Sequence, residues 1–435
     1  MKCAFVLLAV GCLLTAVNAQ WLDTTLVLPD SSWPGALCYN DSNNRVYCAC
    51  FGRDSVTVID GATNGVVANV TTGRPPCVLC YNDSNNKVYI ANPSSDTVTV
   101  IDGATNEVVA AVPANGSPWT LCYNTQSNKV YCATRGRGNV TIIDGATNGV
   151  VATVTADSMP YALCYNSKDN KVYCTNEASD NVTVIDGATD SVVATVPVRR
   201  YPGALCYNSK DNKVYCTNRG VSPNDDSTVT VMDGVTNGVL AIVPTGRAPW
   251  ALCYNPLDNK VYVANAFSGT VTVIDGATNG VLATVPADII PCALIHNPQN
   301  NKVYCANDYS GTVTVIDGAT NQVLRTIGVG DEPGAFCYNP VQNRVYVANY
   351  HSSSISVIRD SMSGVEETPK PQAPSRKPAA TVLSGVSGVG RLATCVVFDA
   401  MGRRVVDPKP GVYFVRDEGL GARDLGRTRK VVIPR

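Results

Sequence analysis

Side chains that could support acid–base or metal chemistry are few in this sequence. Histidine occurs only at His296 and His351. Two isolated histidines cannot build a His-rich copper or zinc site, and neither has the partners of a catalytic triad. No nucleophile elbow, P-loop or dinucleotide-binding glycine motif stands between a strand and a helix. We therefore expect no enzymatic activity and assign no catalytic, cofactor-binding or metal-binding residue.

Carboxylates recur at a fixed spacing, which could be taken for a ring of catalytic or metal-binding groups. An Asp-Gly pair ends a Val/Thr run at Asp60, Asp102, Asp144, Asp186, Asp233, Asp275 and Asp317. We interpret these as turn residues, because an Asp at such a place accepts hydrogen bonds from local backbone N–H groups. Asp225 and Asp226 offer oxygens for a calcium ion in an inserted loop, but no EF-hand register surrounds them. A solvated acidic loop is the preferred interpretation.

Cysteine is unusually frequent, and 16 of the 18 cysteines follow residue 19. Four pairs lie ten residues apart: Cys38/Cys48, Cys122/Cys132, Cys164/Cys174 and Cys206/Cys216. A hairpin would place the members of each pair opposite one another on adjacent strands, so disulfides are conceivable in an exported protein. The same columns hold Ile90, Val263, Ile295 and Val347 elsewhere. We therefore favour buried apolar thiols, with disulfides as the alternative.

A repeat of 42 residues organises most of the chain. Tyrosines mark it at Tyr39, Tyr81, Tyr123, Tyr165, Tyr207, Tyr254 and Tyr338, with His296 in the same column. Each unit contains four short runs with the residue types and alternation of β-strands, joined by Asn-, Asp- and Gly-rich turns. Four antiparallel strands at this period are typical of a propeller blade. We predict an all-β, eight-bladed propeller, with seven blades as the alternative.

The first and last units suggest how the ring closes. Thr24 to Pro29 resembles a fourth strand that precedes the first complete unit, and the eighth unit stops after its third strand at Ile358. We predict that the N-terminal strand completes the last blade, which would remove two open sheet edges.

The repeat units resemble YVTN-type β-propeller repeats of surface-layer-like proteins. The stretches that carry this resemblance are Thr-Val-Thr-Val-Ile-Asp-Gly at 97–103 and Val-Tyr-Val-Ala-Asn at 261–265, and it spans roughly residues 22–360. The resemblance implies a propeller that is usually exported and whose ligand is often undefined. It implies no reaction.

The chain divides into four parts. Residues 1–19 have the charge, apolar core and small-x-small end of a cleavable signal peptide, with a lipoprotein site at Cys12 as the alternative. Residues 20–360 form the propeller, 361–380 a Pro-rich linker, and 381–435 a small β-sandwich-like tail. Export to the medium or the cell surface follows as an expectation.

The tail resembles the C-terminal sorting domain of type IX secretion cargo. Phe-Asp-Ala-Met-Gly-Arg-Arg-Val at 398–405, Lys-Pro-Gly-Val-Tyr-Phe-Val-Arg at 409–416 and the terminal Arg-Lys-Val-Val-Ile carry this resemblance. It implies contact with outer-membrane secretion machinery and surface attachment. A small β domain that only caps the chain is the alternative.

The two connections that differ most between units emerge at the same end of a propeller, and we predict a ligand-binding face there. Its candidate residues are Trp33, Trp119, Arg135, Tyr161, Arg199, Arg200, Tyr201, Trp250, Tyr309 and Tyr350. Trp, Tyr and Arg commonly anchor interfaces or stack on sugars, although Trp119 and Trp250 could instead pack between blades.

The leading function is a surface or secreted module that binds a protein, a glycan or an envelope component. A lactonase-like or quinoprotein-like enzyme and a self-associating surface-layer tile are alternatives. A net charge of −1 and the lack of a long apolar run favour neither nucleic acid nor a membrane span.

Overall fold

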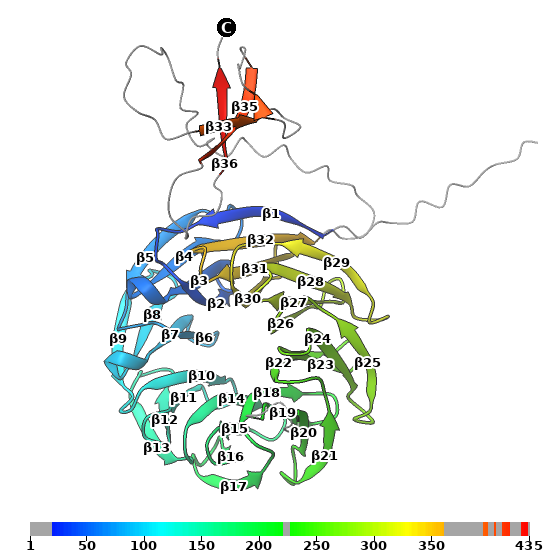
Figure 1. The fold of residues 1–435 in the computed structure, drawn as a ribbon. Coiled ribbons are helices and arrows are strands. Elements are labelled where there is room, and N and C mark those ends of the chain that lie inside the picture. The colour runs from blue at the N-terminus through cyan, green and yellow to red at the C-terminus, as the bar shows by residue number, and fades with distance from the viewer. Residues whose placement is uncertain are drawn as a thin grey trace, which may run out of the picture. The chain divides into compact units, whose positions relative to one another are not determined.

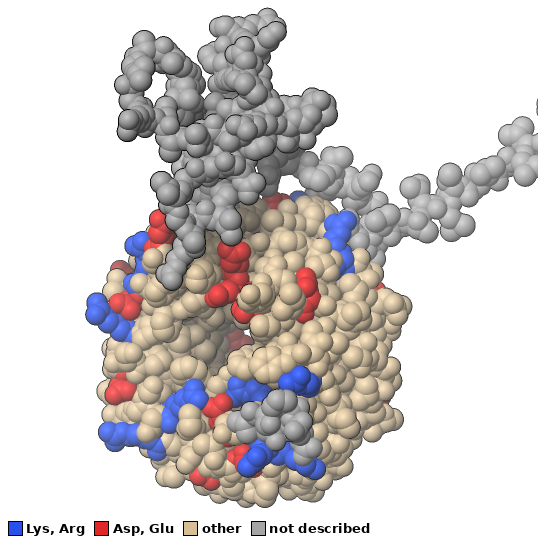
Figure 2. Space-filling view, viewed as in Figure 1, with Lys and Arg blue, Asp and Glu red and all other residues tan. Residues whose placement is uncertain are grey.

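The computed structural model describes residues 20–220 and 227–360, together with strands of residues 395–433. The described residues between 20 and 360 form a ring of eight four-stranded antiparallel sheets, called blades 1 to 8, around a central hollow (Figures 1 and 2). The predicted eight-bladed, all-β propeller is confirmed, and the seven-bladed alternative is wrong. The expected signal peptide (1–19) and linker (361–380) lie outside the described residues, as do Asp225 and Asp226.

The first four blades follow directly from the repeat, with strands in chain order from the innermost to the outermost. Their strands are, for blade 1, β2 (Pro34–Asn40), β3 (Arg45–Cys50), β4 (Ser55–Asp60) and β5 (Val66–Thr71); for blade 2, β6 (Val78–Asn82), β7 (Lys87–Asn92), β8 (Thr97–Asp102) and β9 (Val108–Pro113); for blade 3, β10 (Pro118–Asn124), β11 (Lys129–Thr134), β12 (Asn139–Asp144) and β13 (Val150–Thr155); for blade 4, β14 (Pro160–Asn166), β15 (Lys171–Asn176), β16 (Asn181–Asp186) and β17 (Val192–Pro197).

The remaining blades repeat this plan, and two three-residue 3-10 helices, η1 (Phe51–Arg53) and η2 (Pro93–Ser95), join strands in blades 1 and 2. The strands are, for blade 5, β18 (Pro202–Asn208), β19 (Lys213–Asn218), β20 (Thr228–Asp233) and β21 (Val239–Pro244); for blade 6, β22 (Pro249–Asn255), β23 (Lys260–Asn265), β24 (Thr270–Asp275) and β25 (Val281–Pro286); for blade 7, β26 (Pro291–Asn297), β27 (Lys302–Asn307), β28 (Thr312–Asp317) and β29 (Val323–Gly328); for blade 8, β30 (Pro333–Asn339), β31 (Arg344–Asn349), β32 (Ser354–Asp360) and β1 (Gln20–Val27).

The ring closes within blade 8, where the N-terminal strand β1 pairs antiparallel with β32 (Figure 1). Gln20 lies opposite Asp360, and Val27 lies opposite Ser354. The predicted closure is confirmed. The closing strand covers Gln20–Val27 and not Thr24–Pro29, because its pairing with β32 extends to the end of that strand.

The core lies between blades, where the faces of neighbouring sheets pack together. A tyrosine on each second strand is fully buried; Tyr89 of blade 2, for example, packs in one cluster with Val130 and Ile143 of blade 3. Because strand side chains alternate between the two faces, each third strand supplies β-branched residues to both neighbours. Burial of these apolar faces is the main force that holds the ring together.

Polar bonds at one end of the ring tie each blade to the next. The hydroxyl of Tyr89 donates to the backbone oxygen of Gly145 (3.3 Å) and to Oδ1 of Asn148 (3.0 Å). The Asn82 amide donates to Oδ1 of Asn128 at 2.9 Å. This Asn-to-Asn bond recurs at every joint of the ring, including the joint between Asn339 of blade 8 and Asn44 of blade 1 (2.9 Å).

The Asp-Gly turns serve this arrangement. Oδ1 of Asp60 accepts hydrogen bonds from the backbone N–H groups of Ala62 (3.1 Å) and Thr63 (2.8 Å). These bonds hold the pKa of Asp60 below its usual value, and the bond from the Thr63 N–H has the largest effect. The glycine is required by close approach, since a Cβ on Gly145 would lie 2.3 Å from Oδ1 of Asn128. The interpretation of this aspartate as a turn residue agrees with these bonds.

The joint between blades 7 and 8 differs from the others, because the fourth strand of blade 8 is the N-terminal strand β1 and no Asp-Gly turn joins it to the third strand. Asp360 occupies the repeat position that holds the glycine of the Asp-Gly turn in other blades. Its carboxylate accepts the hydrogen bonds that the backbone oxygen of that glycine accepts at other joints. It pairs with Nζ of Lys302 at 2.7 Å and accepts hydrogen bonds from the hydroxyl of Tyr304 (2.6 Å) and from Nε2 of Gln20 (3.0 Å). Both charged side chains are buried, with exposed fractions of 1% for Lys302 and 0% for Asp360.

The described part of the tail is a four-stranded antiparallel sheet, with strand order β34-β33-β35-β36. Its strands are β33 (Cys395–Phe398), β34 (Arg404–Val405), β35 (Gly411–Asp417) and β36 (Thr428–Ile433). The all-β character agrees with expectation. These strands form a single sheet, and the second layer of the expected sandwich is not among the described residues.

Candidate functional site

The connections that vary between repeats lie together at one end of the ring. In every blade except blade 2, where Pro93 has no N–H, the loop after the second strand is bonded to the segment that precedes the first strand: the N–H of Arg135 donates to the oxygen of Ser117 (3.0 Å), and that of Glu177 to the oxygen of Met159 (3.0 Å). Both acceptor residues have positive φ, at 56°. We call this end the variable-loop face. Its loops are fixed by backbone bonds, while their side chains differ from blade to blade.

Six side chains of blades 3 to 6 meet near the inner edge of this face, and we call them the mouth cluster: Trp119, Arg135, Tyr161, Glu177, Arg219 and Trp250. The aromatic residues lie at the start of innermost strands, and the charged residues follow second strands. The guanidinium of Arg135 lies 5.0 Å from the ring centre of Trp119 and 5.6 Å from that of Tyr161. Such distances are those of cation–π contacts.

Arg219 continues the same stack. Its guanidinium lies 4.3 Å from the ring centre of Tyr161 and 4.8 Å from that of Trp250. Gly203, in blade 5, occupies the column that holds an aromatic residue in blades 3, 4 and 6; a Cβ there would lie 2.8 Å from Nε of Arg219. The glycine therefore gives Arg219 the space to lie between two aromatic rings.

Glu177 links the two arginines. Its Oε1 accepts from Arg219 at 2.5 Å, and its Oε2 pairs with Nη2 of Arg135. The Glu177 side chain is only 13% exposed, and charge-assisted bonds of this kind are stronger than neutral ones. Arginines and glutamate together hold the aromatic rings in fixed positions.

The sequence predicted part of this cluster. Trp119, Arg135, Tyr161 and Trp250 were among the expected residues, and the structure brings them together. Glu177 and Arg219 were missed, although the sequence contains a signal: Arg135, Glu177 and Arg219 follow one another at intervals of 42 residues, so the charges alternate in one repeat column.

The side chains of the other expected residues are not part of the mouth cluster. Trp33 and Tyr350 stack at 6.0 Å in the first and last blades, with Phe51 at 6.4 Å from Tyr350. Four more are exposed on the variable loops: Arg199, Arg200, Tyr201 and Tyr309. Among them Tyr201 lies beside the mouth cluster, because its backbone oxygen accepts a hydrogen bond from the N–H of Arg219 (3.1 Å). The two tryptophans of the mouth cluster differ in exposure. Trp119 is half-buried, as a residue that packs between blades would be, whereas Trp250 is 45% exposed, as a ligand-binding residue would be.

Charge is divided unevenly over the variable-loop face. Arginines gather on the loops of blades 3 to 6, whereas Asp308, Asp331 and Glu332 lie on blades 7 and 8. Burial and the neighbouring Glu332 raise the pKa of Asp308. Figure 2 shows a similar division on the side it displays, with blue atoms gathered below the hollow and red atoms bordering it above.

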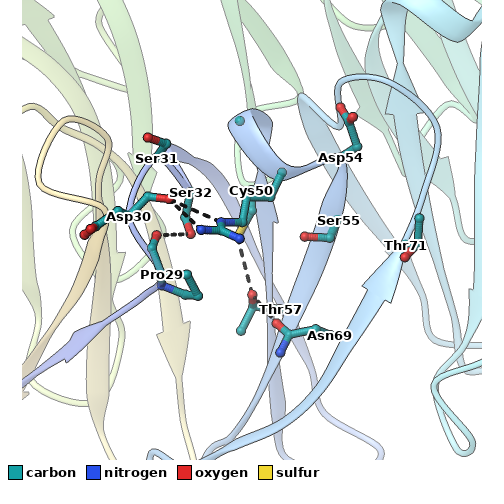
Figure 3. A pocket seen from close by; sticks show the side chains of 12 residues that line it. Pro29, Asp30, Ser31, Ser32, Cys50, Asp54, Ser55, Thr57, Asn69 and Thr71 are labelled. Atoms are coloured by element: carbon teal, nitrogen blue, oxygen red, sulfur yellow. Dashed lines mark hydrogen bonds between the residues drawn. The ribbon is translucent and has the colours of Figure 1, made fainter.

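A polar groove lies beside blade 1 and is drawn in Figure 3. The sulfur of Cys50 lies 3.4 Å from Oγ1 of Thr57, and that hydroxyl donates to Oδ1 of Asn69 at 2.8 Å. Most other blades have Asn at the repeat position of Cys50. The side-chain amide of this Asn donates a hydrogen bond to the third strand, as Asn92 does to Oγ1 of Thr99 (2.9 Å). Cys50 is 1% exposed, so the groove offers no accessible thiol.

The cysteines of residues 20–360 are all free thiols, and the strand register explains why the expected pairs do not meet. Cys38 lies opposite Tyr47, and Leu37 lies opposite Cys48. The expectation of directly opposed cysteines is wrong by one residue, which turns the two side chains to different faces of the blade. Burial raises the pKa of the Cys38 thiol to about 12 and that of Cys122 to about 12.

Two further findings concern the described part of the chain. No three or more His, Cys, Asp or Glu side chains there are grouped so that they could hold a metal ion. In the same residues, no helix has the length and apolar character needed to cross a membrane.

Comparison with known proteins identifies the repeat. The sequence model of the YNCE-like β-propeller family matches residues 2–225. No curated protein matches the sequence. Two similar solved structures are a hydrazine synthase chain of Kuenenia stuttgartiensis (18% identity, TM-score 0.56, 77% of this chain and 97% of that one) and Sqt1 of Saccharomyces cerevisiae (11% identity, TM-score 0.67, 78% and 99%). One is named as an enzyme and the other is not, so this likeness shows the fold and no activity.

Proposed function

The chain belongs to the YNCE-like β-propeller family, and we propose that it is a binding module whose ligand contacts the variable-loop face at the mouth cluster. The observation that carries this proposal is the restriction of the cluster to blades 3 to 6. In the other blades the aromatic column holds Gly35, Cys77, Cys292 and Gly334, and the charged column holds Phe51, Pro93, Asp308 and Tyr350, so the alternation of arginine and glutamate does not recur. A contact needed only to join blades would recur around the ring, as the Asn-to-Asn bond does.

The rigidity of the cluster also supports a binding role. Both arginines are held on aromatic faces and by Glu177, so little side-chain freedom remains to be lost when a ligand arrives. Pre-organised aromatic and arginine side chains are typical of residues that dominate binding energy. Trp250, 45% exposed, offers ring surface to a ligand.

A pair of matched variants tests this role. Labelled wild-type protein, Trp250→Ala and Phe267→Ala are applied to an array of glycans and an array of short peptides. Phe267 lies on another loop of the same blade and is 68% exposed, so it controls for the loss of an exposed ring. We expect binding that falls by about tenfold or more in Trp250→Ala and persists in Phe267→Ala. Failure of every probe to bind, or an equal loss in both variants, would contradict the proposal.

We propose in addition that residues 1–19 export the protein and that the tail, 381–435, directs its surface display. The support is the composition of residues 1–19 and the resemblance of the tail to type IX sorting domains. Cells that produce the chain with and without residues 381–435 are fractionated and treated with external protease. Protease access that depends on the tail is expected. Unchanged access without it would contradict sorting and leave the binding role intact.

A further inference from the structure

Lysine is absent from the described variable loops, whereas the opposite end of the ring carries lysines together with Arg45 and Arg344. The lysines of residues 20–220 and 227–360 all lie at or near the turn between first and second strands, at the end opposite the variable-loop face: Lys87, Lys129, Lys168, Lys171, Lys210, Lys213, Lys260 and Lys302. The described cations of the variable loops are all arginines: Arg53, Arg74, Arg135, Arg137, Arg199, Arg200, Arg219 and Arg247. Arginine presents a planar fork of donors that matches a carboxylate, and it also stacks on flat rings.

A groove of about 430 Å³ lies beside the mouth cluster, between the Arg135–Gly138 loop and residues 155–159. This volume is in the range of small-molecule sites. Arg137, on its edge, is exposed. Arg135 also lines it, and its Nε is buried without a hydrogen-bond partner. We call this feature the arginine groove.

The arginine groove holds a hydrogen-bond acceptor as well as donors. The carboxylate of Asp157 accepts from the Ser158 N–H (2.8 Å), Ser179 Oγ (2.7 Å) and Asn181 Nδ2 (2.8 Å). These bonds, the one from Asn181 foremost, lower the pKa of Asp157. Only one of them reaches Oδ2, and a carboxylate oxygen has two acceptor sites. The groove thus combines arginine donors with a fixed anionic acceptor.

A ligand must match three features at this place: arginine donors, a carboxylate acceptor and flat aromatic surface. We propose that the arginine groove and the mouth cluster bind a linear acidic glycan. Carboxylates of its uronic-acid units would pair with Arg137, hydroxyl groups would donate to Asp157, and sugar faces would stack on Trp250. This inference rests on the proposed binding function and names its ligand class.

An acidic peptide fits these residues less well. Its carboxylates would meet the arginines, but it brings few hydroxyl donors for Asp157. Peptide ligands also commonly use apolar pockets for side-chain anchors, whereas Met159 is the one large apolar side chain among the residues that line the arginine groove. A groove lined mainly by charged and polar groups, beside the aromatic rings of the mouth cluster, favours a sugar.

Titration of the full chain with three probes tests the inference. The probes are an oligogalacturonate, the same oligomer with its carboxyl groups methyl-esterified, and an oligoglutamate with the same number of carboxylates. We expect the oligogalacturonate to bind at least about tenfold more tightly than either of the other two, since each lacks one of the matched groups. The ester tests the need for charge, and the oligoglutamate tests the need for sugar.

Matched arginine variants locate the site. Arg137→Gln should weaken oligogalacturonate binding by about tenfold, the usual effect of losing one charge-assisted contact, whereas Arg74→Gln on the loop between blades 1 and 2 should change it less than about twofold. Arg137 and Arg74 are both exposed, so each variant is expected to fold, which a thermal melt confirms.

The outcomes separate this inference from the proposed function. Equal binding of the ester, tighter binding of the oligoglutamate, or an equal effect of both arginine variants would overturn the acidic-glycan inference. If acidic glycans fail but the arrays reveal another ligand whose binding depends on Trp250, the inference falls and the binding function stands. If no probe depends on Trp250, both fall.

Discussion

The sharpest stability prediction concerns Asp360, the residue that closes the ring. Its carboxylate is the buried partner of Lys302 and accepts hydrogen bonds from Tyr304 and Gln20. Asp360→Ala would leave the Lys302 ammonium buried without its anion. Burial and Asp360 together raise the pKa of Tyr304, so the phenol stays protonated and also loses its acceptor.

The size of the effect follows from burial. Removing one partner of a buried ion pair costs about 3–5 kcal/mol, because the remaining charge is desolvated and uncompensated. Domains of 150–250 residues lose roughly 2–4 °C in Tm per kcal/mol, and larger ones lose less. We therefore expect Asp360→Ala to lower the free energy of unfolding by about 4 kcal/mol and Tm by less than about 8 °C, because the ring exceeds 250 residues.

Thermal and urea unfolding of the full chain, followed by circular dichroism, measures this change. Asp317→Ala is the matched control, since Asp317 ends the third strand of blade 7 but caps an exposed turn; we expect it to cost about 1 kcal/mol. The double variant Lys302→Met/Asp360→Asn should recover much of the loss, because it removes both charges. The reasoning is refuted if Asp360→Ala costs no more than Asp317→Ala, or if the double variant is less stable than Asp360→Ala.

Three further predictions can be checked by the same unfolding measurements. Gly145→Ala should cost about 1–3 kcal/mol from steric overlap, whereas Gly149→Ala, with its nearest neighbour 3.4 Å from the new Cβ, should stay within about 0.5 kcal/mol; equal costs would contradict the proposed contact. Burial lowers the pKa of His296, so the wild type should lose stability as pH falls below 6.5, the ordinary value, where the unfolded imidazole binds a proton more readily. His296→Tyr should remove that loss, and an unchanged pH profile would refute it. Cys132→Val should cost less than about 1.5 kcal/mol and Cys132→Ser about 1–3 kcal/mol more, while equal and large losses would indicate a disulfide.

The ring could be predicted because its determinants are local and repeated. A tyrosine column, a Val/Thr run and an Asp-Gly turn recur in nearly every unit, and each fixes a strand or a turn within its own blade. The closing strand was also predictable, because the eighth unit lacks a fourth strand. Its start at Gln20 was not, since the buried carboxylate of Asp360 that binds Gln20 lies 340 residues away in sequence.

The candidate site could be predicted only in part. Residue type pointed to Trp119, Tyr161 and Trp250, but sequence reasoning did not compare charges down one repeat column. That comparison would have found Glu177 between two arginines. The cysteine pairs failed for a geometric reason: a shift of one residue in hairpin register changes the face of every side chain, and spacing alone does not fix that register.

The position of Asp360 has a consequence for the order of folding. Most strand pairs join residues within one 42-residue unit, so blades 1 to 7 can form from contacts near in sequence, which are the fast ones. Completion of blade 8 needs the pairing of β1 with β32, which are separated in sequence by nearly the whole ring. Before Asp360 is in place, the Lys302 ammonium has no partner carboxylate, so it remains solvated by water and is not buried. A nascent chain should therefore remain an open arc of blades until its final strand emerges, and closure should be its slowest step.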